Sequence, residues 1–117
     1  MEPVVGVALS VGGTFDKVIG LYTIDDVQDE ETRPIHIPVE IKSIVGFMVE
    51  GAAVTSDDSF QLKVNNVVKL TASAGGVWVE ADVPLVIHEG DTCVPVVGTL
   101  AGGTGWAHCY IRFSRSA

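Results

Sequence analysis

Apolar and polar residues alternate along much of this chain with the period of two that is typical of half-buried β-strands. The clearest run begins at Ile35, after which apolar residues recur at odd positions as far as Val49 and polar residues such as His36 occupy even ones. The alternation weakens near Ser43, where both faces are covered or a β-bulge interrupts the pairing. We therefore predict a strand from Ile35 to Glu50 with one buried face.

Shorter runs of β-branched and aromatic residues follow one another between turn residues, and no long segment has the period of a helix. Asn65 and Asn66 predict a tight hairpin turn, because asparagine tolerates positive φ. Without helices to connect parallel strands, the sheets are expected to be antiparallel. The other predicted strands cover residues 4–11, 18–24, 60–64, 67–72, 77–80, 84–87, 92–97 and 106–113.

Such spacing is typical of an all-β sandwich, and we predict an antiparallel, jelly-roll-like sandwich of about eight strands. The 117 residues suffice for one ordinary domain, which we assign to residues 1–117. Residues 1–16 have two interpretations at this stage. They form either an N-terminal arm or the first strand of the sandwich.

Composition narrows the range of partners. Seven basic residues stand against fifteen acidic ones, which gives a formal net charge of −8. Nucleic acids and acidic membranes both require basic patches, so we predict that the protein binds neither. Hydrophobic residues make up 47% of the chain and charged residues only 19%. The charged fraction is below the usual one of about 25%, which favours a partner that covers some apolar surface.

The chain has neither a long apolar run nor a basic, apolar start, so we expect a soluble protein made without a signal peptide. Two cysteines do not make a disulfide framework and fit a reducing compartment. A bridge between Cys93 and Cys109 would require that their two strands pair. Buried free thiols are the favoured interpretation.

Residues that often hold metals do not have the spacing of a metal site. The histidines His36, His88 and His108 form no H-x-x-x-H or H-E-x-x-H pattern. In the acidic segment 25–34, the EF-hand pattern fails at its glycine and final glutamate positions. We interpret the histidines as surface or interface residues and the acidic segment as a solvated loop. A site built from all three histidines, or an adventitious Ca²⁺, is the less favoured alternative, and we expect no cofactor.

The sequence also has no arrangement of residues that is typical of nucleophilic catalysis. Cys109 follows His108 directly, and adjacent strand residues point to opposite faces, so the two are badly placed as a catalytic pair. No serine lies in a nucleophile elbow. The glycine-rich loop 102–105 leads into a strand and not into the helix N-terminus that a phosphate site uses. We predict that the protein is not an enzyme.

The last predicted strand carries an aromatic face. Trp106 and Tyr110 share one phase of it, whereas Cys109, Ile111 and Phe113 share the other. If the second set faces the core, the two aromatic residues point outward, which is typical of an interface. The alternative is that this strand is covered on both faces.

From Ile35 onward, the order of features resembles that of a known group of proteins. The strand Ile35–Glu50 is followed by segment 58–66, the run Val77-Trp78-Val79, the turn 89–91 and segment 105–113. This layout resembles small jelly-roll structural proteins of tailed bacteriophages, especially capsid decoration (cement) proteins, and more distantly trimeric jelly rolls of the tumour-necrosis-factor type. The resemblance implies a homotrimer seated on a shell of major capsid proteins, with an N-terminal segment that often helps to anchor it.

The resemblance thus implies a non-enzymatic virion protein on the capsid surface, assembled in the host bacterial cytoplasm, that binds and stabilises the assembled shell. A carbohydrate-binding or receptor-binding head that uses exposed aromatic residues, Trp78 included, is the alternative. A small enzyme on a cupin-like jelly roll ranks last, because the metal-ligand pattern is missing. The residues expected at an interface are Val4, Val5, Val7, Leu9, Trp106 and Tyr110.

Overall fold

The computed structural model describes residues 6–9, 17–29, 32–37 and 39–116. Every regular element among them is a β-strand, and no helix is long and apolar enough to cross a membrane in this part of the chain. The strands are β1 (Gly6–Leu9), β2 (Lys17–Ile24), β3 (Ile35–His36), β4 (Ser43–Ala52), β5 (Ser59–Val64), β6 (Val67–Ser73), β7 (Val79–Val86), β8 (Thr92–Thr99) and β9 (Trp106–Ser114).

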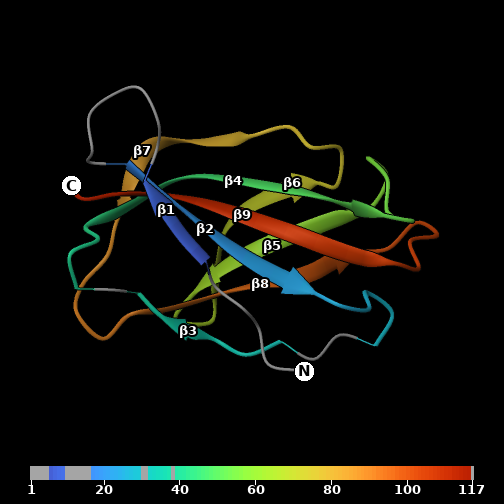
Figure 1. The fold of residues 1–117 in the computed structure, drawn as a ribbon, viewed down its shortest axis with the longest axis horizontal. Coiled ribbons are helices and arrows are strands. Elements are labelled where there is room, and N and C mark those ends of the chain that lie inside the picture. Colours follow the sequence, from blue (N-terminus) through green and yellow to red (C-terminus); the bar gives the residue numbers. More distant parts are fainter. Residues whose placement is uncertain (1–5, 10–16, 30–31, 38, 117) are drawn as a thin grey trace.

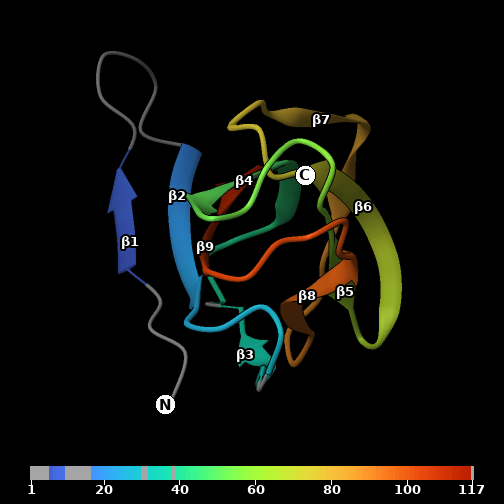
Figure 2. The ribbon, with the colours of Figure 1, turned by 90° about the vertical axis from the view of Figure 1, so that its right-hand side faces the viewer.

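The strands form two antiparallel sheets that face each other (Figures 1 and 2). Sheet A has the order β1-β2-β9-β4-β7, and sheet B has the order β3-β8-β5-β6. Without β1, this is the jelly-roll order of eight strands in two sheets of four. From β2 onward, the chain changes sheet at every connection except the β5–β6 hairpin. The prediction of an antiparallel, jelly-roll-like sandwich is confirmed.

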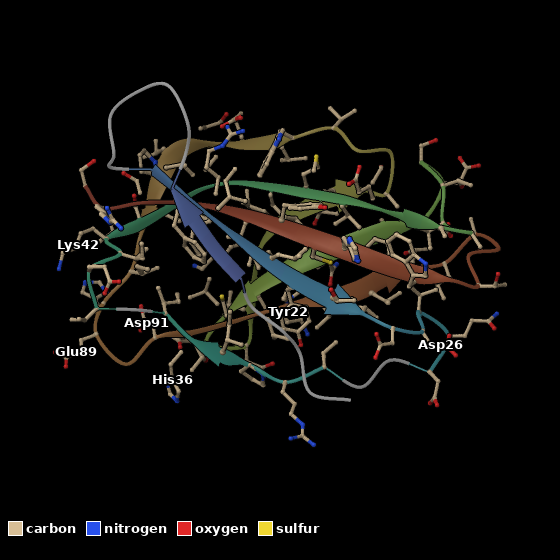
Figure 3. All side chains as sticks on the ribbon, viewed as in Figure 1. Tyr22, Asp26, His36, Lys42, Glu89 and Asp91 are labelled. Atoms are coloured by element: carbon tan, nitrogen blue, oxygen red, sulfur yellow. The ribbon has the colours of Figure 1, made fainter. Side chains whose placement is uncertain are left out.

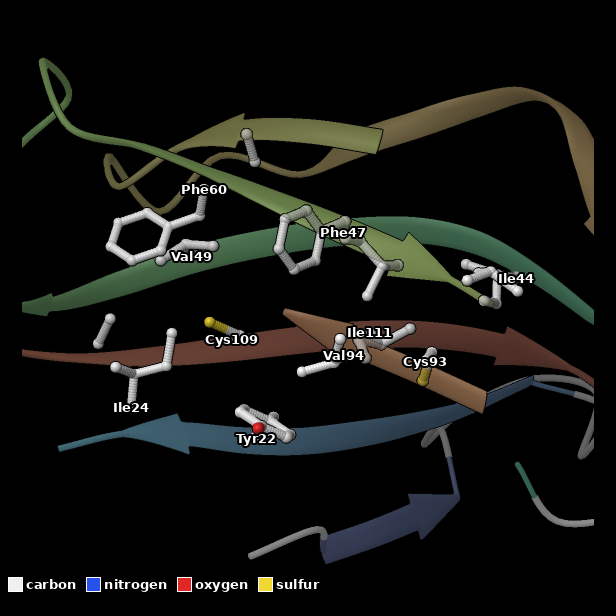
Figure 4. Packing of buried hydrophobic residues seen from close by; sticks show 14 of the residues in the cluster. Tyr22, Ile24, Ile44, Phe47, Val49, Phe60, Cys93, Val94, Cys109 and Ile111 are labelled. Carbon is white, nitrogen blue, oxygen red and sulfur yellow. The ribbon is translucent and has the colours of Figure 1, made fainter. Parts of the chain in front are cut away.

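The core lies between the sheets, and the alternation of β9 shows how the sequence builds it. Ala107, Cys109, Ile111 and Phe113 are buried, while the residues between them are partly exposed. Facing residues from the other strands complete a single apolar cluster (Figure 4). Deeply buried members of this cluster include Tyr22, Ile44, Phe47, Val49, Phe60 and Leu62.

The predicted single strand from Ile35 to Glu50 is wrong. The segment forms β3 and β4, which belong to different sheets, because the chain crosses between the layers at residues 37–42. The apolar alternation continues through the crossover, since Ile37 and Ile41 are still buried there. Val39 lies in the turn and is 63% exposed. Period-two patterning therefore shows neither strand continuity nor uninterrupted burial in this segment.

Two local predictions about the backbone are confirmed. Asn65 and Asn66 form the β5–β6 turn with φ values of 49° and 68°, in the left-handed region that asparagine tolerates. The register of β4 shifts between Ile44 and Gly46, and Ser43 and Ile44 are both buried, so both explanations of the weak alternation near Ser43, a bulge and coverage of both faces, apply.

The buried carboxylate of Asp58, which sequence reasoning missed, holds two loops together at one end of the sandwich. Asp58 accepts backbone N–H groups from Thr55 at 2.8 Å, Ala101 at 2.7 Å and Gly103 at 3.1 Å. These bonds join the β4–β5 loop to the β8–β9 loop. They hold the pKa of Asp58 below its ordinary value, even though burial acts in the opposite direction.

Two glycines of the loop 102–105 allow close approach between segments of the chain. A Cβ atom at Gly105 would overlap the carbonyl group of Ala52. A Cβ atom at Gly103 would meet the carboxylate of Asp58 at 2.7 Å. Only glycine lets this loop pack against the end of β4 and supply an N–H group to Asp58.

Candidate interaction surface

The outer face of sheet A carries the aromatic residues that the sequence singled out. Figure 1 looks onto this sheet, in which β9 runs between β2 and β4. Trp106 is 40% exposed, and Tyr110 is half-buried. Because Cys109 and Ile111 are buried between the sheets, Trp106 and Tyr110 point outward as expected. Their role at an interface stays a prediction.

A row of rings extends along β9 on this face. The ring centroids of Trp106 and His108 are 4.3 Å apart with planes tilted by 39°. The His108 ring meets Tyr110 edge-on at 6.3 Å between centroids. Residues two apart on a strand share a face, so this spacing follows directly from the sequence. We call Trp106, His108, Tyr110 and Arg112, with the residues beside them on this face, the β9 platform.

The phenol of Tyr110 is engaged across the sheet. Its O–H group donates a hydrogen bond to the Oε1 atom of Glu50 on β4, over 3.2 Å. Burial raises the pKa of Tyr110, and the hydrogen bond to the Glu50 carboxylate and its negative charge raise it further. The neutral phenol is thus a fixed donor, and Glu50 is held on the outer face.

At the other end of the platform, Arg112 joins β9 to β7 and to the third aromatic residue. Its guanidinium group lies 4.1 Å from the ring centroid of Trp78, and its Nη1 atom donates to Glu80 over 2.7 Å. Gly46 lies beneath this stack, since a Cβ atom there would meet the Trp78 ring at 3.3 Å. Trp78 therefore belongs to the same surface as Trp106, at the opposite end of the row.

Apolar side chains flank the aromatic row. Tyr110 is paired with Leu21 on β2 and with Met48 on β4. Directly opposed residues of antiparallel strands share a face, and both neighbours are half-buried. The centre of the platform thus combines an aromatic ring with two flexible aliphatic chains, a composition typical of protein interfaces. Leu21 and Met48 were missed from the sequence because only the strand order reveals them.

No protein-family model matches this chain, and a search of curated proteins found no relative. The geometry of the platform is therefore the main basis for assigning a role.

The N-terminal residues proposed as a contact are described only in part. Val4 and Val5 lie outside the described residues. Val7 and Leu9 belong to β1, which pairs with β2 at the edge of sheet A, from Gly6 opposite Leu21 to Leu9 opposite Val18. The backbone of residues 6–9 is thus an edge strand, added to an already complete jelly roll.

The three histidines lie on separate elements. His36 is on β3 and His88 is in the β7–β8 loop, and both are exposed, whereas His108 belongs to the β9 platform. His88 lies 3.9 Å from the carboxylate of Asp91, which also accepts the backbone N–H of His88. Within the described ranges, no group of three or more His, Cys, Asp or Glu residues could hold a metal ion.

Both thiols are buried, and neither forms a disulfide. Cys93 is on β8 in sheet B and Cys109 is on β9 in sheet A, so their strands do not pair as a bridge would require (Figure 4). Burial raises the pKa of Cys93 to about 12. Its thiol is therefore a core group, without the low pKa that a nucleophile needs.

The acidic segment is a surface loop in its described part. Asp25, Asp26 and Asp29 are exposed, and Asp26 accepts the backbone N–H of Gln28 over 2.9 Å (Figure 3). Val27 is buried and donates its backbone N–H to Gly105. The buried phenol of Tyr22 bonds to the backbone of Arg33. These contacts fasten a loop whose carboxylates face solvent.

Proposed function

We propose that this protein is a non-enzymatic structural protein of a bacteriophage virion, a decoration protein that binds the assembled capsid shell as a homotrimer. The observation that carries this proposal is the β9 platform. It presents Trp106, Tyr110 and Met48 on a broad sheet face, on which Arg112 is paired with Glu80 and Glu50 accepts a hydrogen bond from the neutral phenol of Tyr110. The jelly-roll fold is compatible with this role, although the fold alone supports many functions.

The pairing of the platform's charges suits attachment to a protein surface. Glu50 is bonded to Tyr110, and Arg112 is bonded to Glu80. Charged groups that already have a partner within the molecule cost less to cover than unpaired ones, because their partners accompany them. Aromatic residues and methionine then supply apolar contact area to the partner.

Such a protein would stabilise a shell by mass action. A ligand that binds the assembled shell and not its separated subunits shifts the equilibrium toward the shell. A trimer that touches several capsid subunits gains further, because each contact raises the effective concentration for the next. Modest individual contacts therefore suffice.

The test uses empty shells assembled from the major capsid protein of the genome that encodes this chain. We expect the purified protein to co-sediment with these shells to saturation, to leave unassembled capsid subunits free, and to raise the temperature at which the shells disassemble. A genome without a capsid gene, or shells that bring down no protein at micromolar concentration, would contradict the proposal.

A carbohydrate-binding head is the second candidate, and the exposed ring of Trp106 favours it. An accessible indole beside His108 provides a stacking surface next to a polar group, which suits a sugar ring. Glycan-array binding that is lost in Trp106→Ala, together with no binding to shells, would select this candidate. Binding to shells with no glycan signal would reject it.

A further inference from the structure

A second apolar surface lies away from the β9 platform, where the edge strands β6 and β7 of the two sheets meet. The large hydrophobic residues that are exposed in the described part of the chain are Trp106 and six valines. Five of these valines lie on or beside this edge, and we call the surface they share the valine edge. They are Val39, Val67, Val68, Val83 and Val86.

The centre of the valine edge is a large bulge in β7. Glu80 pairs with Gly46 and Leu85 pairs with Ile44, so the four residues 81–84 stand opposite the single residue Val45. The excess chain cannot remain in the sheet and is pushed outward. Val83 is 72% exposed on this bulge. Exposed apolar residues that cluster on such a protrusion are typical of an interface.

Two hollows lie next to the bulge. One has a volume of about 120 Å³ and is lined by residues that include Ile37, Ile41 and Ile87. The other has a volume of about 270 Å³ and lies between Val64 and the bulge itself. Ile87 lines both of them. Small-molecule sites usually measure about 300–1,000 Å³, so these hollows suit single side chains of a protein partner better.

The charges around the valine edge identify that partner as a second copy of this chain. Lys42 and Glu89 line the smaller hollow, Lys69 lines the larger one, and Asp82 lies exposed in the bulge. With the exposed Glu40 next to Val39, this surface carries two basic and three acidic residues, whereas the whole chain has 7 basic and 15 acidic residues. Two such acidic molecules repel each other over most of their surface, and a patch that carries charges of both signs is where they can approach.

We propose that the valine edge is a contact between copies of this chain, in which the β7 bulge of one copy inserts into the smaller hollow of the next. Val83 fills the hollow, and Asp82 beside it meets Lys42 on the rim, whose Nζ atom lies 3.2 Å from the carbonyl oxygen of Val39. Figure 3 shows Lys42 and Glu89 at one end of the molecule and Asp26, of the acidic loop, at the other. A bulge of one copy in the hollow of the next is a heterologous contact, and the homotrimer of the proposed function requires that the rotation between neighbouring copies closes after three of them.

This inference deepens the proposed function, because it supplies the contact by which copies would group on a shell. Self-association is nevertheless tested in solution without shells, so the further inference and the proposed function can fail independently of each other. Loss of shell binding by a protein that still self-associates would count against the proposed function alone.

The first test compares two exposed valines. Val83 and Val77 are 72% and 71% exposed, but only Val83 lines a hollow. We expect light scattering to show an oligomer for the wild type and for Val77→Asp, and about tenfold weaker self-association or more for Val83→Asp, because a carboxylate would lose its water on entering the hollow. A monomeric wild type at high concentration, or an unchanged Val83→Asp oligomer, would overturn the proposal.

The second test is a charge reversal. Lys42→Asp and Asp82→Lys should each weaken self-association, and the double variant should restore it, because the opposite charges are regained in reversed order. All three variants change exposed residues, and circular dichroism checks that they fold. A double variant no stronger than the single ones would show that Asp82 does not meet Lys42 in the contact.

Discussion

The carboxylate of Asp58 accepts a hydrogen bond from the backbone N–H of Gly103, 3.1 Å away and 45 residues further along the chain. Gly103 has no side chain to occupy this space, and a Cβ atom there would displace the carboxylate. This pair fixes the β8–β9 loop that leads directly into Trp106. The position of one end of the β9 platform thus depends on a buried charge in another loop.

Asp58 is expected to make stability depend on pH in the acid range. The folded-state pKa is lowered, so the stabilisation is complete above the unfolded pKa of about 3.9 and is lost as the pH falls through the lower folded value. Asp58→Asn removes the charge and places an amide N–H group against a backbone donor. We expect its melting temperature at neutral pH to fall by more than about 4 °C.

Thermal unfolding followed between neutral and strongly acidic pH checks this expectation. The difference between the wild type and Asp58→Asn should shrink as the pH falls below 3.9. Asp57→Asn is the matched control, because Asp57 is the exposed neighbour of Asp58. An Asp58→Asn difference that stays constant across the acid range would show that the carboxylate charge is not what stabilises these loops.

Trp106→Ala is expected to weaken partner binding while leaving the fold intact. The ring lies at the surface, and only its contacts with neighbours such as His108 are lost. An exposed substitution of this kind usually changes stability by less than about 0.5–1 kcal/mol, whereas an aromatic residue central to an interface contributes about 2 kcal/mol or more to binding. Co-sedimentation with shells measures the second quantity, and thermal unfolding measures the first.

Val77→Ala serves as the control for that variant, since Val77 is exposed but lies outside the β9 platform. Normal shell binding by Trp106→Ala would remove this residue from the contact. A large fall in melting temperature would instead show that Trp106 acts as part of the fold.

Cys93 is expected to resist thiol reagents in the folded protein. Burial raises its pKa to about 12, so the reactive thiolate is scarce at neutral pH, and the side chain is also covered. A colorimetric thiol reagent should label Cys93→Ser and Cys109→Ser variants slowly, and quickly once urea unfolds them. Rapid labelling of the native Cys109→Ser variant would contradict the described burial of Cys93.

The sequence predicted those features that depend on neighbouring residues. Alternation along β9 was enough to separate Cys109 and Ile111 from Trp106 and Tyr110, because a strand has only two faces. The alternation from Ile35 onward led to the wrong prediction of one continuous strand. A segment that crosses between two sheets can alternate in the same way without pairing to other strands. The period of two cannot distinguish these cases.

Features that depend on contacts between segments far apart in the sequence could not be predicted from the sequence. Asp57 and Asp58 are adjacent and chemically identical, and only the approach of the β8–β9 loop makes one of them a buried acceptor. The bulge around Val83 likewise depends on the register between β7 and β4. The short runs 77–80 and 84–87 were predicted as separate strands, but the structure joins them into β7.

Deleting residues 1–9 separates the two interpretations of the N-terminal segment. β1 pairs only with β2, at the edge of sheet A, and the remaining eight strands already form a complete jelly roll. We therefore expect the truncated protein to unfold cooperatively, with a melting temperature only moderately below that of the full chain. If the segment also anchors the protein to a shell, co-sedimentation with shells will be lost while self-association through the valine edge remains.

The control for this deletion is a variant that keeps residues 1–9 in place but makes them less apolar. Replacing Val4 and Val5 by serine leaves the backbone free to pair but removes side chains that an anchor would use. Loss of shell binding in this variant, with an unchanged melting temperature, would favour an anchor, because pairing of the β1 backbone alone would then be insufficient for binding. A truncated protein that fails to fold would instead make β1 an essential strand of the sandwich, and full shell binding with unchanged stability would exclude both roles for residues 1–9.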